Sequence, residues 1–326
     1  MKRLLVITVT VLIALSGCQK KDNGILIGIS KIVSHPALDA IEQAIQDELV
    51  AQGVENVTYD LQNANGDVNT AATIANKFKA EKVNIAIGIA TPTAVALANA
   101  IKDAPVIYSA VTDPVGANLV ESFDKGGPNV TGVSDMTPVK EQIEMLNRIK
   151  PLKALGHVYS SGETNAVILA GMAKEACEEL GIEFIEATVT NSSEVKQATQ
   201  AIIDKIDGLY VSTDNTVVSA LASLTDVAVK NGVPIMSADP SSAEKFEVLV
   251  AWGFDYYKMG RATGRMVKQI LDGKKTSEIP TMFMTDPSDI DLLVNLDLAK
   301  KMGIEIPADI VNSANKLVKD GSLEIK

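Results

Sequence analysis

The chain places small polar and charged side chains directly after several short apolar runs, where they could hold a small charged ligand. Thr91 and Thr112 supply hydroxyl donors suited to a carboxylate, and a helix amino terminus would add backbone donors. Asp214 or Asp239 supplies an anion suited to an ammonium group. Together these groups could bind a zwitterion. The candidate binding residues are Ser34, His35, Thr91, Pro92, Thr112, Asp113, Asn165, Thr213, Asp214, Asn215 and Asp239.

Each of these positions also has a purely structural explanation. Ser, Thr, Asp and Asn are common N-caps where a strand leads into a helix. Pro92 follows Thr91, and proline is favoured in the first helical turn, so capping alone would account for this pair. The ligand hypothesis therefore depends on the whole set lying together rather than on any single residue.

Signals for catalysis or for a cofactor are weak. The chain has two histidines, and His157 sits inside an apolar run that predicts a packed core residue. A hydrolase triad would have to use His35, but no G-x-S-x-G motif accompanies it. The segment 273–276 lacks the pattern of a phosphate-binding loop, and neither a dinucleotide fingerprint nor a Cys/His metal spacing occurs. We therefore expect no enzymatic activity, no cofactor and no metal.

The composition is that of a globular protein large enough for two hydrophobic cores. Of the 326 residues, 46% are hydrophobic and 22% are charged, which excludes a disordered chain and a collagen-like repeat. With 30 basic and 41 acidic residues the net charge is −11, and no local basic patch offsets it. A nucleic-acid partner is therefore not expected.

Short runs rich in Ile, Val and Ala alternate with longer helical segments, and this order occurs twice. The first half predicts strands at 25–30, 57–61, 83–89 and 106–110, separated by helices at 36–52, 69–81 and 92–102. The second half predicts strands at 154–160, 183–188, 208–212 and 234–238, separated by helices at 164–180, 193–205 and 216–231. Continuous apolar strands are typical of parallel sheets covered by helices on both faces. The fold class is therefore α/β, with two doubly wound parallel-sheet lobes joined by a hinge; a single large sheet is the competing arrangement.

The two repeats suggest the domain boundaries. We expect lobe 1 to span 25–136 and lobe 2 to span 137–254. The segment 255–278, with a helix capped by Asp255, is expected to return to lobe 1, and the tail 279–326 to cross back to lobe 2. Ligands of open α/β sheets bind beyond the carboxyl ends of the strands. The candidate residues are therefore expected to meet in a cleft between the lobes.

The amino terminus has the pattern of a bacterial export signal. A basic start and an apolar run of about twelve residues lead to Leu-Ser-Gly-Cys at 15–18, which resembles a lipobox. We expect 1–17 to be a lipoprotein signal peptide, Cys18 to carry the lipid, and 18–24 to be a lipidated tether. The apolar run is too short to span a bilayer, so membrane attachment would rest on the lipid alone. The alternative is a soluble secreted protein with an incidental cysteine.

Short motifs along nearly the whole chain after the tether resemble those of one family. This family comprises the substrate-binding lipoproteins of ABC importers in the tryptophan and tyrosine transport group, which are similar in fold to type I periplasmic binding proteins. The resemblance implies two lobes, joined by three crossings, that close on a small molecule. Two loops that border the expected cleft, at 159–165 and 240–246, depart from the family pattern. The matching motifs lie at 27–29, 34–40, 63–67, 90–92, 110–117, 129–135, 137–142, 213–216, 238–239 and 253–256.

The resemblance also implies a ligand and partners. The ligand would be an aromatic amino acid (tryptophan, tyrosine or phenylalanine), with Thr91 and Thr112 near its carboxylate and Asp214 or Asp239 near its ammonium. The protein would be exported, anchored at the extracytoplasmic face of the cell membrane, and would deliver its ligand to an ABC permease and its ATPase. The alternatives are another small solute, such as another amino acid, a nucleoside or a sugar, a sensor subunit on the same fold, and a surface enzyme dependent on His35 or an aspartate pair.

Overall fold

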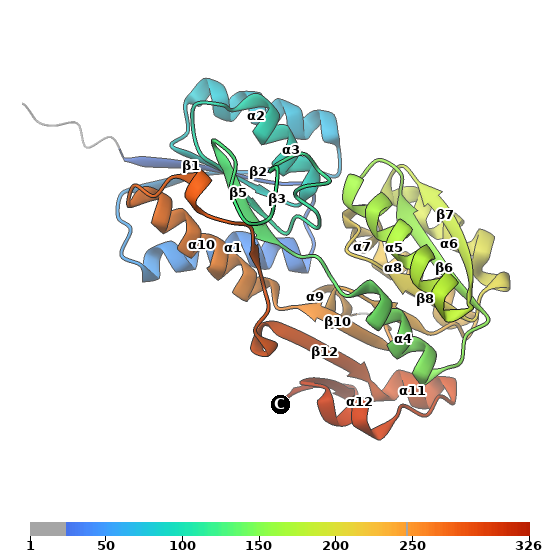
Figure 1. Ribbon diagram of the computed structural model, residues 1–326. Helices are drawn as coiled ribbons and strands as arrows, with labels where there is room; N and C mark the ends of the chain where they lie inside the picture. The colour runs from blue at the N-terminus through green and yellow to red at the C-terminus, as the bar shows by residue number, and fades with distance from the viewer. Residues whose placement is uncertain (1–23, 246) are drawn as a thin grey trace, which may run out of the picture.

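The computed structural model describes residues 24–245 and 247–326, which form two lobes, each built around its own sheet (Figure 1). The expected signal peptide, Cys18 and the tether up to residue 23 lie outside the described residues. The predicted α/β class with two sheets is confirmed, and the single-sheet alternative is wrong. None of the helices in the described part of the chain is long and apolar enough to cross a membrane.

The first lobe contains a parallel six-stranded sheet in the order β11-β5-β4-β3-β1-β2. Helices α1 and α10 pack together on one face, and α2 and α3 on the other (Figure 1). Because helices cover both faces, every residue of β3, β4 and β5 is buried. The strands are β1 (Ile25–Lys31), β2 (Val57–Asn63), β3 (Ile85–Ile89), β4 (Val106–Ser109), β5 (Val130–Ser134) and β11 (Met282–Phe283), and the helices are α1 (Pro36–Ala51), α2 (Val68–Glu81), α3 (Thr91–Ala100) and α10 (Tyr256–Leu271).

The second lobe contains an eight-stranded sheet in the order β14-β13-β12-β10-β9-β8-β6-β7, in which β12 is antiparallel to β10 and β14 is antiparallel to β13. Its strands are β6 (Ala154–Ser160), β7 (Glu183–Val189), β8 (Gly208–Val211), β9 (Ile235–Ser237), β10 (Val250–Phe254), β12 (Ile290–Asn295), β13 (Lys316–Lys319) and β14 (Ser322–Ile325). Its helices are α4 (Val139–Ile149), α5 (Thr164–Leu180), α6 (Val195–Ile202), α7 (Asn215–Ser219), α8 (Leu221–Lys230), α9 (Pro240–Ala243), α11 (Leu296–Met302) and α12 (Ala308–Ser313).

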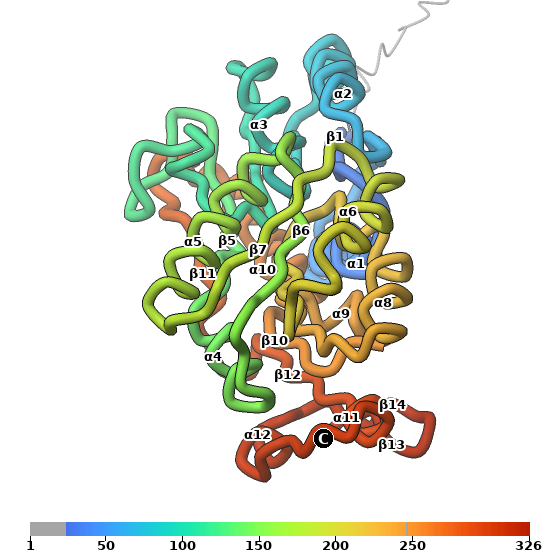
Figure 2. Tube along the Cα trace, turned by 90° about the vertical axis from the view of Figure 1, so that its right-hand side faces the viewer, coloured from blue at the N-terminus to red at the C-terminus, as the bar shows by residue number. Residues whose placement is uncertain are grey.

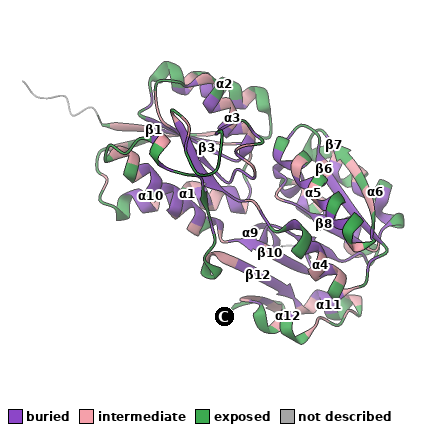
Figure 3. Cartoon of the chain, viewed as in Figure 1, coloured by how far each residue is buried: buried purple, intermediate pink, exposed green. Residues whose placement is uncertain are grey.

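Two predicted helices differ in detail from the observed ones. The helix expected at 216–231 is divided into α7 and α8, because Ala220 has φ −110° and ψ 18°, outside the helical range. Within the helix expected at 193–205, only α6 is an α-helix, and a short 3-10 helix lies on each side of it. In both lobes the buried positions follow the strands and the inward helix faces, and exposed positions cover the outer helix faces (Figure 3).

Helix α10 belongs to the first lobe although it follows the second in sequence. Asp255 caps it by accepting a hydrogen bond from Lys258 N at 3.1 Å, as the sequence predicted. Gly260 and Gly264 allow close packing on α1: a Cβ on Gly260 would lie 2.6 Å from the Ile41 carbonyl oxygen. Small residues at this contact therefore let the two helix backbones approach closely.

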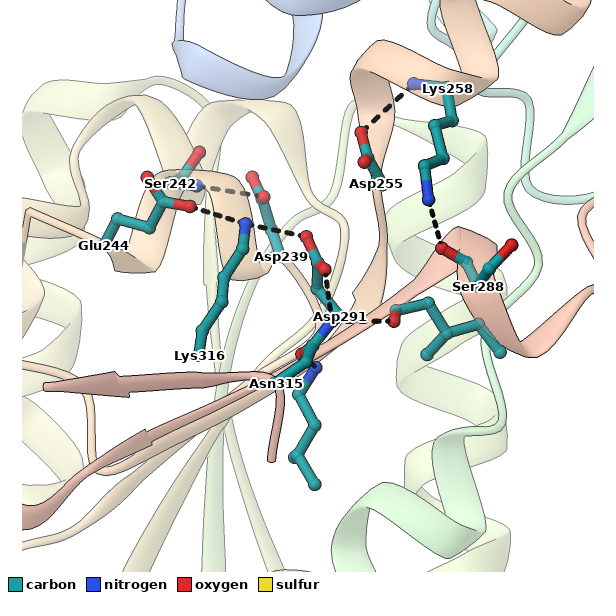
Figure 4. Close-up of polar contacts among 11 residues, drawn as sticks. Asp239, Ser242, Glu244, Asp255, Lys258, Ser288, Asp291, Asn315 and Lys316 are labelled. Carbon is teal, nitrogen blue, oxygen red and sulfur yellow. Dashed lines mark hydrogen bonds and ion pairs between the residues drawn. The ribbon is translucent and has the colours of Figure 1, made fainter. Parts of the chain in front are cut away.

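Three crossings join the lobes, between β5 and α4, between β10 and α10, and between β11 and β12. The second and third are tied together, because Asp255 N donates to the Asp289 carbonyl at 2.8 Å. Lys258 Nζ also donates to the Ser288 carbonyl (Figure 4). We expected the tail to leave lobe 1 at 279, but Met282 and Phe283 pair with β5. The third crossing therefore follows β11, a strand too short to show a pattern in the sequence.

The tail completes the second lobe. After the third crossing, β12 joins β10, and β13 and β14 extend the sheet beyond it. Figure 2 shows this C-terminal region, with α11 and α12, at the opposite end of the molecule from α2 and α3. Residues of the tail also enter the core of the second lobe, among them Leu298, Ile310 and Leu317.

Candidate functional site

A small cavity lies where the carboxyl ends of strands from both sheets meet. The first lobe contributes residues that follow β1, β4 and β5, and the second contributes residues that follow β6, β8 and β9. The cavity volume is about 10 Å³, which is room for roughly one water molecule. A larger ligand therefore enters only if the lobes move apart. The lining residues are His35, Leu38, Ala110, Thr112, Asp135, Asn165, Thr213, Asp214, Asn215, Val218, Asp239 and Tyr256.

Seven of the eleven candidate residues line this cavity, and four do not. Ser34 points elsewhere, since its hydroxyl donates to Asp39 Oδ2 at 2.7 Å in an exposed position. Asp113 closes a turn, with Oδ1 accepting from Val115 N at 3.0 Å and from Gly116 N at 2.9 Å. Thr91 and Pro92 form the first turn of α3 and are outside the cavity lining. The seven that meet are His35, Thr112, Asn165, Thr213, Asp214, Asn215 and Asp239.

Thr91 nevertheless has an unusual environment. It is 3% exposed, and within the described residues its hydroxyl has no hydrogen-bond partner. It follows Ala90, which has φ 77°, and the equivalent residue after β4, Ala110, has φ 55°. Such values are costly for a residue with a Cβ and occur where surrounding structure imposes them, often at binding sites. The start of α3 therefore holds a free donor in a strained backbone close to the ends of β3 and β4.

Sequence reasoning missed two polar residues that line the cavity, Asp135 and Tyr256. Thr112 Oγ1 donates to Asp135 Oδ1 at 3.3 Å, and the Tyr256 hydroxyl donates to Asp135 Oδ2 at 3.2 Å. Asp135 directly follows β5 and is 4% exposed, so the strand-end rule that selected the other residues would also have found it. Tyr256 lies one residue past the α10 cap and gives no such signal.

Asp214 and Asp239 both cap helices and both face the cavity. Asp214 accepts from Val217 N at 3.0 Å through Oδ1 and from Ser160 N at 2.6 Å through Oδ2, so both of its oxygens already have partners. Asp239 uses only Oδ1 as a cap, accepting from Ser242 N at 3.0 Å. Its Oδ2 lies 4.0 Å from His35 Nδ1. Capping and ligand binding are therefore compatible, and Asp239 has the more available oxygen.

An ion-pair network supports the helix that follows Asp239. Lys316 Nζ lies 2.6 Å from Glu244 Oε1, just after α9, and 2.7 Å from Asp291 Oδ2 on β12 (Figure 4). Asn315 Nδ2 donates to the other Asp291 oxygen at 2.8 Å. Burial lowers the pKa of Lys316, but its hydrogen bonds to Asp291 and Glu244 more than offset this and raise it. The tail thus fixes the position of α9, and through it that of Asp239.

The cavity has an excess of buried acidic groups over basic ones. Burial raises the pKa of Asp135 to about 6, and burial together with the nearby Glu163 carboxylate raises that of Asp214 to about 8. Burial lowers the pKa of His35, so this histidine is a poor counter-cation. No Lys or Arg is among the described residues that line the cavity. Buried carboxylates without a cation are costly, and a bound cation would relieve that cost.

A second, outer cavity of about 70 Å³ continues the cleft between the lobes. Asn215 lines both cavities, so the two are adjacent. The first lobe contributes Ile32, Val33, Asn65 and Gly66, and the second contributes Glu163, Asn191, Ser192, Asn215, Thr216 and Ser219. A ligand can therefore contact both lobes along the cleft.

The remaining histidine, His157, is part of the core of the second lobe. His157 is fully buried in β6, its Nδ1 lies 3.0 Å from the Tyr210 carbonyl oxygen, and burial lowers its pKa to about 4. The prediction of a core residue is confirmed. Within the described ranges, no cluster of three or more His, Cys, Asp or Glu side chains could hold a metal ion.

Two α/β lobes that meet over a cavity at the ends of their strands define the class of type I periplasmic binding proteins, as related structures confirm. Residues 26–318 match the family of ABC transporter substrate binding proteins. A tyrosine-binding protein of Clostridioides difficile is 36% identical over 284 residues, which are 86% of this chain and 81% of that protein. The chain belongs to this family of ABC transporter substrate-binding proteins.

Solved structures agree with this assignment. A conserved domain protein of Vibrio cholerae has a TM-score of 0.87 at 39% identity, with 90% of this chain and 99% of that chain covered. An ABC domain of Streptococcus pneumoniae in complex with L-Trp has a TM-score of 0.86 at 33% identity, with 90% and 100% covered. The ligand-free, open structure of a substrate binding protein from Clostridium difficile has a TM-score of 0.65 at 37% identity, with 87% and 97% covered. The predicted resemblance to the tryptophan and tyrosine group is confirmed.

Proposed function

We propose that this protein captures an aromatic amino acid between its lobes, outside the cytoplasm, and delivers it to an ABC permease. The observation that carries the proposal is the set of buried acidic residues Asp135, Asp214 and Asp239 around a cavity that has no Lys or Arg among its described lining residues. The ammonium of an amino acid supplies the missing positive charge. As a binding protein, the chain carries out no chemical step.

The two ends of the zwitterion have different partners in this proposal. The ammonium lies against Asp239 Oδ2, the free carboxylate oxygen, with Asp214 and Asn165 beside it. The carboxylate lies toward Thr112 and the amino terminus of α3, where Thr91 has a buried donor without a partner among the described residues. Backbone donors and the helix dipole at that terminus favour an anion. Of the eleven candidates, Ser34, Pro92 and Asp113 have no ligand contact in this proposal.

Two further observations support an aromatic ligand. The relatives include one named as tyrosine-binding and one solved with L-Trp, both more than 30% identical to this chain. The cavity also has apolar and aromatic lining in Leu38, Val218 and Tyr256. The aromatic side chain would extend along the cleft toward the outer cavity.

The arrangement of the lobes supports a hinge that closes on the ligand. The chain matches the L-Trp complex more closely than the ligand-free, open relative, although its identity to the open relative is higher. At similar identity, a lower TM-score over a similar coverage is expected when two lobes are differently oriented. This difference supports a closed arrangement of the described lobes, and in the proposal the ligand shifts an open–closed equilibrium toward that arrangement.

The test is thermal unfolding of the chain from Gln19 onward, after removal of co-purified ligand, against the twenty amino acids, common sugars and nucleosides. A ligand at about a thousand times its dissociation constant adds roughly 4 kcal/mol to the free energy of unfolding. We expect tryptophan, tyrosine or phenylalanine to raise the melting temperature by several degrees. A shift with sugars or nucleosides alone would contradict the proposed ligand.

We also propose that the protein is anchored by a lipid on Cys18. The lipobox-like residues 15–18 support this proposal. A Cys18→Ser variant expressed in a bacterial host is expected to move from the membrane fraction to the soluble fraction, because the lipid is the only anchor proposed. The same membrane recovery for the variant and the wild type would contradict lipid anchoring.

A further inference from the structure

Glu163 is a buried carboxylate at the cleft to which the proposed site gives no direct role. It directly precedes α5, is 5% exposed, and lines the outer cavity. It does not line the inner cavity, where the proposed ammonium partners lie. A charge removed from water requires compensation by hydrogen bonds or by an opposite charge.

Four hydrogen bonds from neutral groups provide that compensation. Glu163 Oε1 accepts from Thr216 N at 2.9 Å and from Thr216 Oγ1 at 2.7 Å. Glu163 Oε2 accepts from Asn215 Nδ2 at 2.6 Å and from Asn165 Nδ2 at 3.5 Å. All four donors belong to the second lobe, so the network is independent of whether the lobes are open or closed.

This network fixes the orientation of the Asn165 amide. Asn165 Nδ2 also donates to the Thr213 carbonyl at 3.1 Å. A half-turn of the amide would place Oδ1 against both Glu163 Oε2 and that carbonyl, so that acceptors would face acceptors. In the observed orientation Asn165 Oδ1 is buried and, within the described residues, has no hydrogen-bond partner. The amide oxygen, rather than the amide N–H group, is therefore available to a ligand.

We infer that Glu163 is a positioning residue that makes the cleft selective for a protonated primary amine. By holding the N–H groups of Asn165 and Asn215, it leaves the second lobe with acceptors at the inner cavity: Asn165 Oδ1 and the carboxylates of Asp214 and Asp239. A primary ammonium has three donors and matches such a set, whereas a ligand with only acceptors there is rejected. The inference rests on the proposed function and assigns the recognition of its amino group.

The test is Glu163→Gln, which keeps the size of the side chain but replaces an acceptor oxygen with an N–H donor. The probes are L-tyrosine and 3-(4-hydroxyphenyl)propanoate, which is the same molecule without the amino group. If the wild type prefers L-tryptophan or L-phenylalanine, that amino acid and its own desamino analogue are used instead. Calorimetry is expected to show affinity for the amino acid falling by about tenfold or more, with affinity for the analogue within about threefold. Proportional losses for both ligands, or no loss for either, would overturn the inference.

Asp207→Asn is a matched control. Asp207 Oδ2 also accepts two hydrogen bonds from neutral groups, from Lys153 N at 2.9 Å and from Ala154 N at 3.1 Å, but at the amino end of β6, away from the cleft. This variant is expected to keep wild-type affinity for both probes. A loss like that of Glu163→Gln would mean that such networks act only through stability.

Asn165→Ala provides a second measurement and a background for a coupling test. Because Glu163 acts through the Asn165 amide, Glu163→Gln should weaken amino-acid binding less in this background than in the wild type. Equal effects in both backgrounds would overturn the inference.

If Glu163→Gln does not fold, Asn165→Ala alone should lower affinity for the amino acid but not for the analogue. Equal losses of affinity for the two ligands would again overturn the inference. A wild-type protein that binds no amine at all would instead refute the proposed function along with this inference.

Discussion

Among the residues of the cavity, the aspartates act in two ways at once. Asp214 and Asp239 cap α7 and α9, and the same side chains line the inner cavity. Their positions are thereby fixed before a ligand arrives, since each carboxylate is held by at least one backbone N–H group. Preorganised side chains of this kind bind a ligand with little loss of conformational entropy.

Asp239→Asn separates the charge from the cap. Asparagine caps a helix about as well as aspartate, so α9 should persist. We expect the affinity for the amino acid to fall roughly 10- to 100-fold, since a hydrogen bond to a charged group contributes about 1.5 to 3 kcal/mol. Asp255→Asn, at a cap outside the cavity, should bind within about twofold of the wild type. Calorimetry that finds both variants equivalent would refute the ammonium role of Asp239.

The raised pKa of Asp214 predicts the direction of two pH effects. The pKa of this carboxyl is about 8 in the folded protein, against roughly 3.9 in the unfolded chain. Its contribution to the free energy of unfolding is therefore fully present below about pH 4 and is lost as the pH rises through 8. The melting temperature of the ligand-free protein should therefore fall from pH 5 to pH 8. Asp214→Asn should show a smaller fall.

A bound ammonium favours the ionised form of the same carboxyl. Affinity for the amino acid should therefore rise between pH 6 and pH 8, by at most about tenfold per pH unit for one group. Titrations in buffers with different heats of ionisation should detect a proton released on binding. Affinity that falls over this range, or proton uptake, would contradict this account of Asp214.

Among the elements, the four-residue helix α9 illustrates how distant segments stabilise one another. A helix this short has little stability of its own, yet it carries Asp239 at its amino terminus and Glu244 at its end. The contact of Glu244 with Lys316 on β13, and that of Lys316 with Asp291 on β12, tie α9 to the tail of the chain (Figure 4). The tail therefore supports Asp239, although no tail residue is among those that line the inner cavity.

Lys316→Met tests that connection. The side chains of Lys316 and Asp291 are 13% and 9% exposed, and removing one partner of such a pair leaves a poorly solvated charge. We expect a loss of about 2 to 3 kcal/mol in the free energy of unfolding, measured by denaturant titration. Lys301→Met, whose pair with Glu247 is 59% and 53% exposed, should change stability by less than about 0.5 kcal/mol. Equal effects would show that the Lys316 network adds nothing.

At the scale of the whole molecule, the geometry requires motion. The inner cavity of about 10 Å³ is closed by both lobes, so an amino acid can enter only after they separate. The first crossing carries Asp135, and Tyr256 at the second crossing donates to it at 3.2 Å. The hinge region and the binding cavity thus share residues, which allows a ligand to influence closure directly.

Closure can be followed with a cross-link across the outer cavity. Val33 belongs to the first lobe, Ser192 belongs to the second, and both line this cavity. In a Val33→Cys, Ser192→Cys variant, the bound amino acid should accelerate reaction with a short bifunctional maleimide, because it raises the population of the closed form. Each single-cysteine variant is the control for labelling without closure. A rate unaffected by a ligand that does bind would contradict ligand-driven closure.

Residue patterns along the chain were enough to predict the local elements and their repetition. Apolar runs of Ile and Val define strands covered on both faces, and residues such as Asp255 define helix starts, because these patterns depend on nearest neighbours along the chain. The strand-end rule also selected seven of the cavity residues, since the carboxyl ends of parallel strands meet at one edge.

Which strand-end residues face the cleft and which close turns depends on contacts that form only in the folded chain. Asp113 and Asp239 both follow strands and precede proline, yet Asp113 caps a turn in lobe 1 and Asp239 directs an oxygen at His35 from the other lobe. The pairing of β11 with β5 and the support of α9 by Lys316 also depend on contacts between distant segments. The same holds for the bonds that join Glu163 to Asn215 and Asn165 to the Thr213 carbonyl. Such contacts leave no periodic signal in a single sequence, because they depend on how segments far apart in the chain come together within a lobe rather than on the order of residues within an element.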